Sequence, residues 1–201
     1  MQRLRELARR VEAVYGEIAD TYAHYQQQRG LNCRSGCGEC CLQPTIEATV
    51  LEVLPLVLSL FDQGKAEQTL AQLEELTEPQ GCFFYQRLSF DGRQGQCSVY
   101  QQRPSICRLF GAAGYRDKQG QPALSVCKVI KADRTTAYQQ TLIAMESDPP
   151  PMMMASKELI NQLDYELGGQ HLPVNEAVKQ ALEKVLFKAW YAGFNDDQQI
   201  A

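Results

Sequence analysis

The stretch Cys33-Arg34-Ser35-Gly36-Cys37-Gly38-Glu39-Cys40-Cys41 places four cysteines within nine residues. Cysteines two or three residues apart on a tight turn can bring two sulfurs to one metal ion, at about 2.3 Å for zinc. Glycines within the stretch supply the backbone freedom that such a turn requires. The adjacent Cys40 and Cys41 side chains diverge, so one fits as a ligand while the other serves a second metal, a cluster edge or another thiol function. The motif therefore predicts a metal site without specifying the metal.

Four further cysteines follow at wider intervals. They are Cys82, Cys97, Cys107 and Cys127, with gaps of 14, 9 and 19 residues between them. Such gaps are too wide for one knuckle, and only the fold can bring these thiols together. Eight thiolates suffice for two four-coordinate sites, or for one four-thiolate cluster with four thiols left over. We therefore regard all eight cysteines as candidate metal ligands.

The composition of the whole chain indicates the cellular compartment in which these thiols act. The 201 residues are 44% apolar and 22% charged, which is typical of a globular protein. The amino terminus lacks the apolar run of a secretory signal, and no stretch is long and apolar enough to span a membrane. We expect a soluble, cytoplasmic protein in a reducing compartment, where clustered thiols stay free for metal rather than forming disulfides.

Charge is unevenly distributed along the chain. Residues 82–128 carry seven basic and two acidic side chains, a net charge of +5, whereas the whole chain carries −4. Together with interspersed aromatic residues, this balance permits nucleic-acid binding. We favour the alternative that arginines such as Arg103 and Arg108, which flank Cys107, offset the charge of thiolate-bound metal. Nucleic acid is accordingly not expected as a partner.

Hydrophobic periodicity predicts a mainly α fold in which helices surround an irregular cysteine-rich module with at most a small β-hairpin. An amphipathic helix is predicted over residues 1–30, with Gly30 as its C-cap. It either packs on its own domain, the interpretation we favour, or binds a protein partner. The metal-binding core is predicted over 31–130, and a helical extension over 131–201.

Further helices are predicted within these segments. The first covers Thr45–Asp62, with Pro55 expected to kink or split it. The second covers about Lys65–Glu78. Others are expected over 129–147, over Ser156–Leu167 with Ser156 as N-cap, and over Val174–Tyr191 with Trp190 in the core.

These residues resemble a known family. The first cysteine cluster, then Cys82-Phe-Phe, and then the string Tyr100-Gln-Gln-Arg103-Pro-Ser-Ile-Cys107-Arg-Leu-Phe110 are similar to the CxxCxxCC cysteine-cluster family. The match covers roughly residues 33–128, with three residues rather than two in the first gap. The resemblance implies chelation of zinc or iron. A related motif in flagellin lysine methylases is thought to hold a four-iron cluster, but this chain shows no glycine-rich loop for a nucleotide cofactor.

No catalytic constellation is visible, so we favour a protein that is not an enzyme and keep an enzyme as a third class of function. His24 and His171 lie far from the cysteines in sequence and fit surface positions better than ligand positions. The sequence favours a metal-binding protein that holds a [4Fe-4S] cluster, because vicinal and surplus cysteines suit a cluster, with roles in redox chemistry, cluster delivery or metal sensing. The alternative is a structural Zn²⁺ site in a non-catalytic interaction module.

Overall fold

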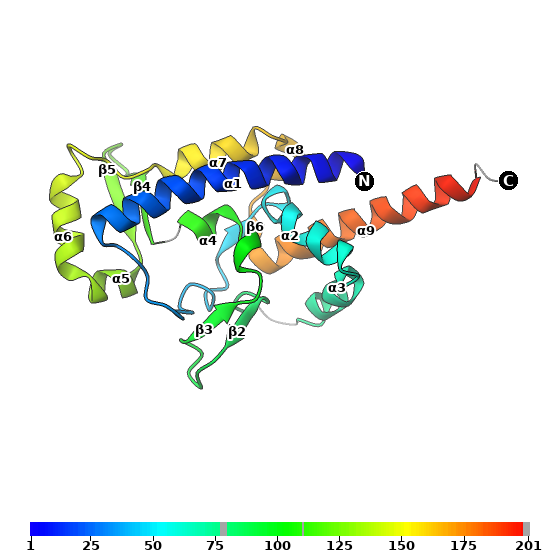
Figure 1. Cartoon of the computed structure of the whole chain (residues 1–201), viewed down its shortest axis with the longest axis horizontal. Helices are drawn as coiled ribbons and strands as arrows, with labels where there is room; N and C mark the ends of the chain where they lie inside the picture. The colour runs from blue at the N-terminus through cyan, green and yellow to red at the C-terminus, as the bar shows by residue number, and fades with distance from the viewer. Residues whose placement is uncertain (77–79, 110, 199–201) are drawn as a thin grey trace.

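The computed structural model describes residues 1–76, 80–109 and 111–198, with side chains described as far as residue 192 (Figure 1). Of the described residues, 56% are helical and 12% are strand, which confirms the predicted mainly α fold. Among the described residues, no helix has the length and apolarity needed to cross a membrane. A large hydrophobic core joins the helices, and a smaller one lies under residues 112–145.

The long N-terminal helix α1 (Gln2–Arg29) ends as its sequence predicts. Gly30 adopts a left-handed conformation, with φ of 65°, and its N–H caps the carbonyls of Gln26 and Gln27. The buried stripe of α1 includes Val11, Tyr15 and Tyr22. It packs on α2 (Val50–Asp62) and α4 (Ser105–Leu109), so the chain itself covers the apolar face of this helix.

Helix α2 lies at the centre of the main core. Thr49 and Glu52 form a capping box at its start, in which each side chain accepts a hydrogen bond from the backbone N–H of the other. The helix begins later than the predicted Thr45, because Glu47–Ala48 forms strand β1. The helix is continuous through Pro55, so the predicted split does not occur. Proline removes one backbone donor, and burial of α2 on almost every side holds the helix together despite that loss.

Two helices pack beside α2. Helix α3 (Ala66–Glu74) is shorter than predicted, and the predicted end at Glu78 lies outside the described residues. Helix α9 (Val174–Gln198) packs on both α2 and α3. Its buried face contains Val178, Ala181, Leu182 and Val185.

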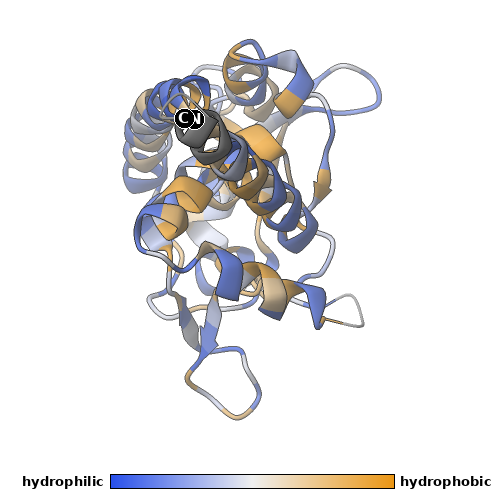
Figure 2. Ribbon diagram, turned by 90° about the vertical axis from the view of Figure 1, so that its right-hand side faces the viewer, coloured by the Kyte–Doolittle hydropathy of each residue, from blue (hydrophilic) through white to orange (hydrophobic). Residues whose placement is uncertain are grey.

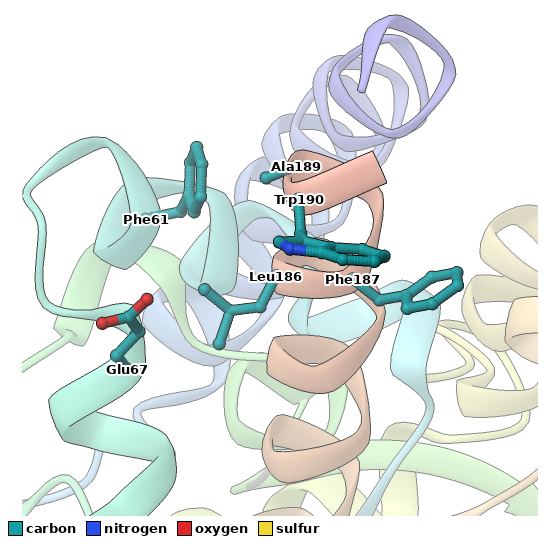
Figure 3. A pocket seen from close by; sticks show the side chains of 6 residues that line it. All are labelled: Phe61, Glu67, Leu186, Phe187, Ala189 and Trp190. Carbon is teal, nitrogen blue, oxygen red and sulfur yellow. The ribbon is translucent and has the colours of Figure 1, made fainter. Parts of the chain in front are cut away.

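The prediction that Trp190 lies in the core is wrong. The side chain is 62% exposed and lines a pocket together with Phe61 from the last turn of α2 (Figure 3). Figure 3 shows its ring beside Phe187, and Tyr191 completes this aromatic group. The 3.6-residue period that buries Val185 turns Phe187 and Trp190 toward the outer face.

The segment that follows α3 is more ordered than predicted. Strands β2 (Tyr85–Arg87) and β3 (Gly95–Cys97) form one antiparallel hairpin, and β4 (Ala112–Arg116) and β5 (Pro122–Val126) form a second. The sequence pattern predicts one hairpin at most. Strand β1 (Glu47–Ala48) pairs with β6 (Leu172–Pro173), a contact across more than 120 residues that no local pattern can reveal.

Two of the predicted helices are each divided in two. Residues 129–147 form α5 (Lys128–Asp133) and α6 (Thr135–Ala144), interrupted at Arg134, whose φ and ψ of −130° and 41° are not helical. Ser156 lies inside α7 (Met153–Asn161) rather than at its N-cap. Asp164 instead caps the following short helix α8 (Tyr165–Gly168), accepting a hydrogen bond from the Leu167 N–H.

Candidate metal centre

All eight cysteines line one cavity of about 690 Å³. The loop between α1 and β1 contributes four thiols, and the others come from segments far along the chain. Cys82 precedes β2, Cys97 ends β3, Cys107 lies in α4, and Cys127 joins β5 to α5. All eight are free thiols. The fold thus brings the widely spaced cysteines to the same cavity as the Cys33–Cys41 cluster.

Backbone hydrogen bonds attach the cysteine loop to its neighbours. The Gly38 N–H donates to the Arg93 carbonyl at 2.8 Å, and the Gly95 N–H donates to the Gly36 carbonyl at 2.9 Å. The Cys82 N–H donates to the Cys41 carbonyl at 2.7 Å. Because peptide groups rather than mobile side chains make these bonds, the relative positions of the two cysteine segments depend on close backbone approach.

Gly81 provides the sharpest test of that approach. A Cβ atom at this position would overlap the Cys41 carbonyl oxygen and press on the Leu42 backbone. We expect Gly81→Ala to cost about 1–3 kcal/mol of unfolding free energy, as overpacking does, and to speed metal loss to a chelator.

Gly16→Ala is the matched control. A Cβ at Gly16 meets nothing within 4 Å, so this change within α1 should stabilise by about 0.5–1 kcal/mol. Thermal melting and chelator kinetics measure both variants. Equal metal retention in Gly81→Ala and wild type would show that the close approach does not shape the site.

The thiols fall into two electrostatic groups. Cys40, Cys41, Cys82, Cys97 and Cys107, here called the inner group, influence one another's ionisation. Cys33, Cys37 and Cys127, the outer group, are linked through Cys33, whose exposed side chain lies next to that of Cys37. Cys40 also acts on Cys33 and so connects the two groups.

Burial and mutual repulsion disfavour thiolates at most of these positions. Burial is the main cause that raises the pKa of Cys107 to about 12 and that of Cys82 to about 11. Partial desolvation and the neighbouring Cys37 raise the pKa of Cys33 to about 12. Cys40 differs, because a hydrogen bond from the Cys41 thiol lowers its pKa to about 6 and raises that of Cys41.

This donor set suits a thiophilic metal. A bound metal cation would remove the repulsion among crowded thiolates, and soft sulfur donors select zinc, copper(I) and iron–sulfur clusters. Among the described residues, no group of three or more Cys, His, Asp or Glu side chains is placed to hold a single ion. His24 and His171 are both exposed, and neither lines the cavity.

The two arginines beside Cys107 have different environments. Arg103 lines the cavity, stacks over the Tyr100 ring at 3.5 Å and acts on the thiols of Cys40, Cys97 and Cys107. Arg108 instead lies 4.5 Å over the Tyr15 ring, and its guanidinium donates to the backbone carbonyls of Arg103 and Gln101. Arg103 therefore faces the thiols, while Arg108 stabilises the loop that carries Arg103.

Behind Cys107 lies a buried polar network that sequence reasoning missed. Glu52 is only 3% exposed, and its carboxylate accepts hydrogen bonds from the Ser105 hydroxyl and the Thr49 N–H. The Tyr15 hydroxyl donates to the Glu52 carbonyl at 2.7 Å. The network ties α1 and α2 to the start of α4, two residues before Cys107. In the sequence, Thr49-x-x-Glu52 before an apolar run is a capping-box pattern, and this pattern could have identified Glu52 as a capping residue.

We expect Glu52→Ala to lower the free energy of unfolding by about 2–3 kcal/mol. The change removes a cap and leaves the Ser105 hydroxyl and the Thr49 N–H buried without their acceptor. Urea denaturation measures the loss. Glu47→Ala, at an exposed position of β1, should change stability by less than about 0.5 kcal/mol. Similar effects for the two variants would contradict the role assigned to Glu52.

A mainly α chain whose thiols all line one cavity defines a cysteine-based metal-chelating protein. The chain belongs to the CxxCxxCC family, described as "Putative zinc- or iron-chelating domain", which matches residues 32–140. This finding confirms the resemblance and supports chelation of zinc or iron through the cysteines. No curated protein and no solved structure matches the chain. The predicted division at residues 30 and 130 stays a prediction.

Proposed function

We propose that this protein holds a four-iron iron–sulfur cluster through thiolates of the inner group, Cys40, Cys41, Cys82, Cys97 and Cys107. The main support for this proposal is that all eight thiols line a single cavity of about 690 Å³. Adjacent Cys40 and Cys41 diverge too much to share one ion, and eight donors exceed the four that one zinc ion takes. A cluster held by four cysteines suits this surplus of thiols better.

The chain's own residues have distinct parts in this proposal. The inner thiols bind, Arg103 offsets their negative charge, and the Glu52 network positions the helix that carries Cys107. Cys33, Cys37 and Cys127 of the outer group are further proposed ligands. Redox chemistry, cluster delivery and metal sensing are all compatible with such a centre. Eight free thiols also suit the reducing cytoplasm.

Anaerobic purification of the full chain tests the metal assignment. A brown protein containing iron and acid-labile sulfide supports the cluster. A colourless protein with stoichiometric zinc overturns it and favours a structural zinc site, which the zinc-or-iron description of the family also permits.

Arg103→Gln should weaken metal retention about 10-fold, as loss of a group beside the ligands commonly does. Its guanidinium lines the cavity and acts on three inner thiols, those of Cys40, Cys97 and Cys107. Arg116→Gln is the control, because Arg116 donates to the Gly120 carbonyl in the second hairpin and does not line the cavity. Competition with a chelator measures retention.

A different result would assign Arg103 to nucleic-acid binding. The wild type would bind nucleic acid with an affinity that falls as salt rises, and Arg103→Gln would abolish this binding without changing metal retention.

A further inference from the structure

The β2–β3 hairpin projects from the body of the molecule and ends in exposed apolar residues (Figure 1; Figure 2). Phe90 is 109% exposed, more than a reference residue in an open peptide, and Leu88 is 70% exposed. Leu88 also lines the cysteine cavity. Single exposed apolar residues are ordinary on protein surfaces, but two on one turn beside the cysteine cavity call for an explanation.

Hydrogen bonds hold this turn in a defined shape. The Ser89 hydroxyl donates to the Asp91 carboxylate at 2.7 Å and accepts from the Gln94 N–H at 2.9 Å. The Asp91 carboxylate also accepts from the Arg93 N–H, and the Tyr85 hydroxyl donates to the Gly92 carbonyl at 2.7 Å. Phe90 is therefore presented on an ordered turn, which lowers the entropy cost of binding through it.

The surroundings of the cavity continue this surface. Tyr100 lines the cavity and remains 57% exposed beneath the Arg103 guanidinium. Nearby, Arg34, Arg93 and Lys128 are well exposed. Arg34 pairs with the Asp133 carboxylate, and Arg93 and Lys128 both pair with that of Glu39. Exposed aromatic residues next to arginine are typical of protein–protein hot spots.

We propose that the hairpin tip and the adjoining cavity rim, defined by Leu88, Phe90, Tyr100, Arg93 and Lys128, form a docking face for a protein partner. That partner presents an apolar pocket for Phe90, surrounded by acidic side chains. The basic side chains exposed on this rim, Arg34, Arg93 and Lys128, outnumber the carboxylates they pair with, Asp133 and Glu39, and so specify the acidic complement. Docking brings the partner to the mouth of the cysteine cavity. That this contact gives the partner access to a metal centre rests on the proposed function. The contact itself does not depend on it.

Site-specific photo-crosslinking of the full chain tests the proposal. A photoreactive phenylalanine replaces Phe90 in the native host's cells, and the same probe replaces Gln119, exposed in the turn of the other hairpin, as the control. We expect a protein with an acidic surface to be captured from position 90 and not from position 119. The purified partner should then bind the wild type with an affinity that falls as salt rises.

Variants of the docking face complete the test. Phe90→Ser should weaken binding of the purified partner at least about 10-fold, as loss of a hot-spot side chain does. Arg93→Gln with Lys128→Gln should slow association and reduce its salt dependence, whereas Lys118→Gln, in the turn of the second hairpin, should not. The metal content of Phe90→Ser should equal that of the wild type, since this side chain does not line the cavity.

Several results would overturn the proposal. The proposal fails if position 90 captures no more protein than position 119, or if the captured protein is a second copy of this chain. It also fails if nuclease treatment removes the capture, or if Phe90→Ser binds the partner as tightly as the wild type. The test is separate from that of the proposed function. If the wild type contains zinc but still captures and binds the partner, the docking face is supported while the cluster assignment fails.

Discussion

Cys40→Ser is expected to lose its metal and to lower the free energy of unfolding by more than about 3 kcal/mol, beyond an ordinary core substitution. Cys40 is the thiol whose pKa is lowered, to about 6, by its bond from Cys41. It also acts electrostatically on Cys82, Cys97 and Cys107. Serine keeps the size of the side chain but is a poor ligand for soft metals. Metal analysis and thermal melting, before and after chelation, measure the effect.

The matched control for this experiment is Cys33→Ser. Cys33 is exposed and belongs to the outer group, so its loss should remove less metal and cost less stability. After complete chelation, the wild type and Cys40→Ser should melt at similar temperatures, since the difference between them arises from bound metal. A Cys40→Ser protein with full metal content and the melting temperature of the wild type would exclude Cys40 as a ligand.

The second large effect is expected from Tyr15→Ala in α1. Tyr15 is almost fully buried, its hydroxyl donates to the Glu52 carbonyl, and its ring lies under the Arg108 guanidinium. Removing the ring leaves a cavity between α1, α2 and α4, at a cost of about 3–5 kcal/mol, the range of large aromatic truncations. Because Arg108 holds the backbone of Arg103, we also expect faster metal loss to a chelator.

Tyr15→Phe separates packing from hydrogen bonding. It keeps the ring and loses one buried hydrogen bond, worth about 1 kcal/mol, so most metal retention should survive. Tyr191→Ala, at an exposed position of α9, controls for loss of an aromatic side chain. Unchanged melting and metal loss in Tyr15→Ala would show that α1 does not support the metal centre.

The features that sequence alone determined depend on neighbours along the chain. The stripe of α1 and the left-handed Gly30 were predictable, because helix periodicity and C-capping are local properties. The Cys33–Cys41 cluster likewise indicates metal chemistry within nine residues, and the family finding agrees with it. The thiol chemistry of the candidate site therefore follows from residue types and their local spacing.

Tertiary structure decided what depends on segments far apart in the sequence. Only the fold shows that Cys82, Cys97, Cys107 and Cys127 reach the same cavity as the first cluster, because chain spacing carries no information about how loops close. Pro55 stays within a continuous helix because α2 is packed on almost all sides. Trp190 is exposed because, among the described side chains of α9, packing against the core reaches only as far as Val185 and Leu186, a limit set by packing partners and not by the hydrophobicity of the residue.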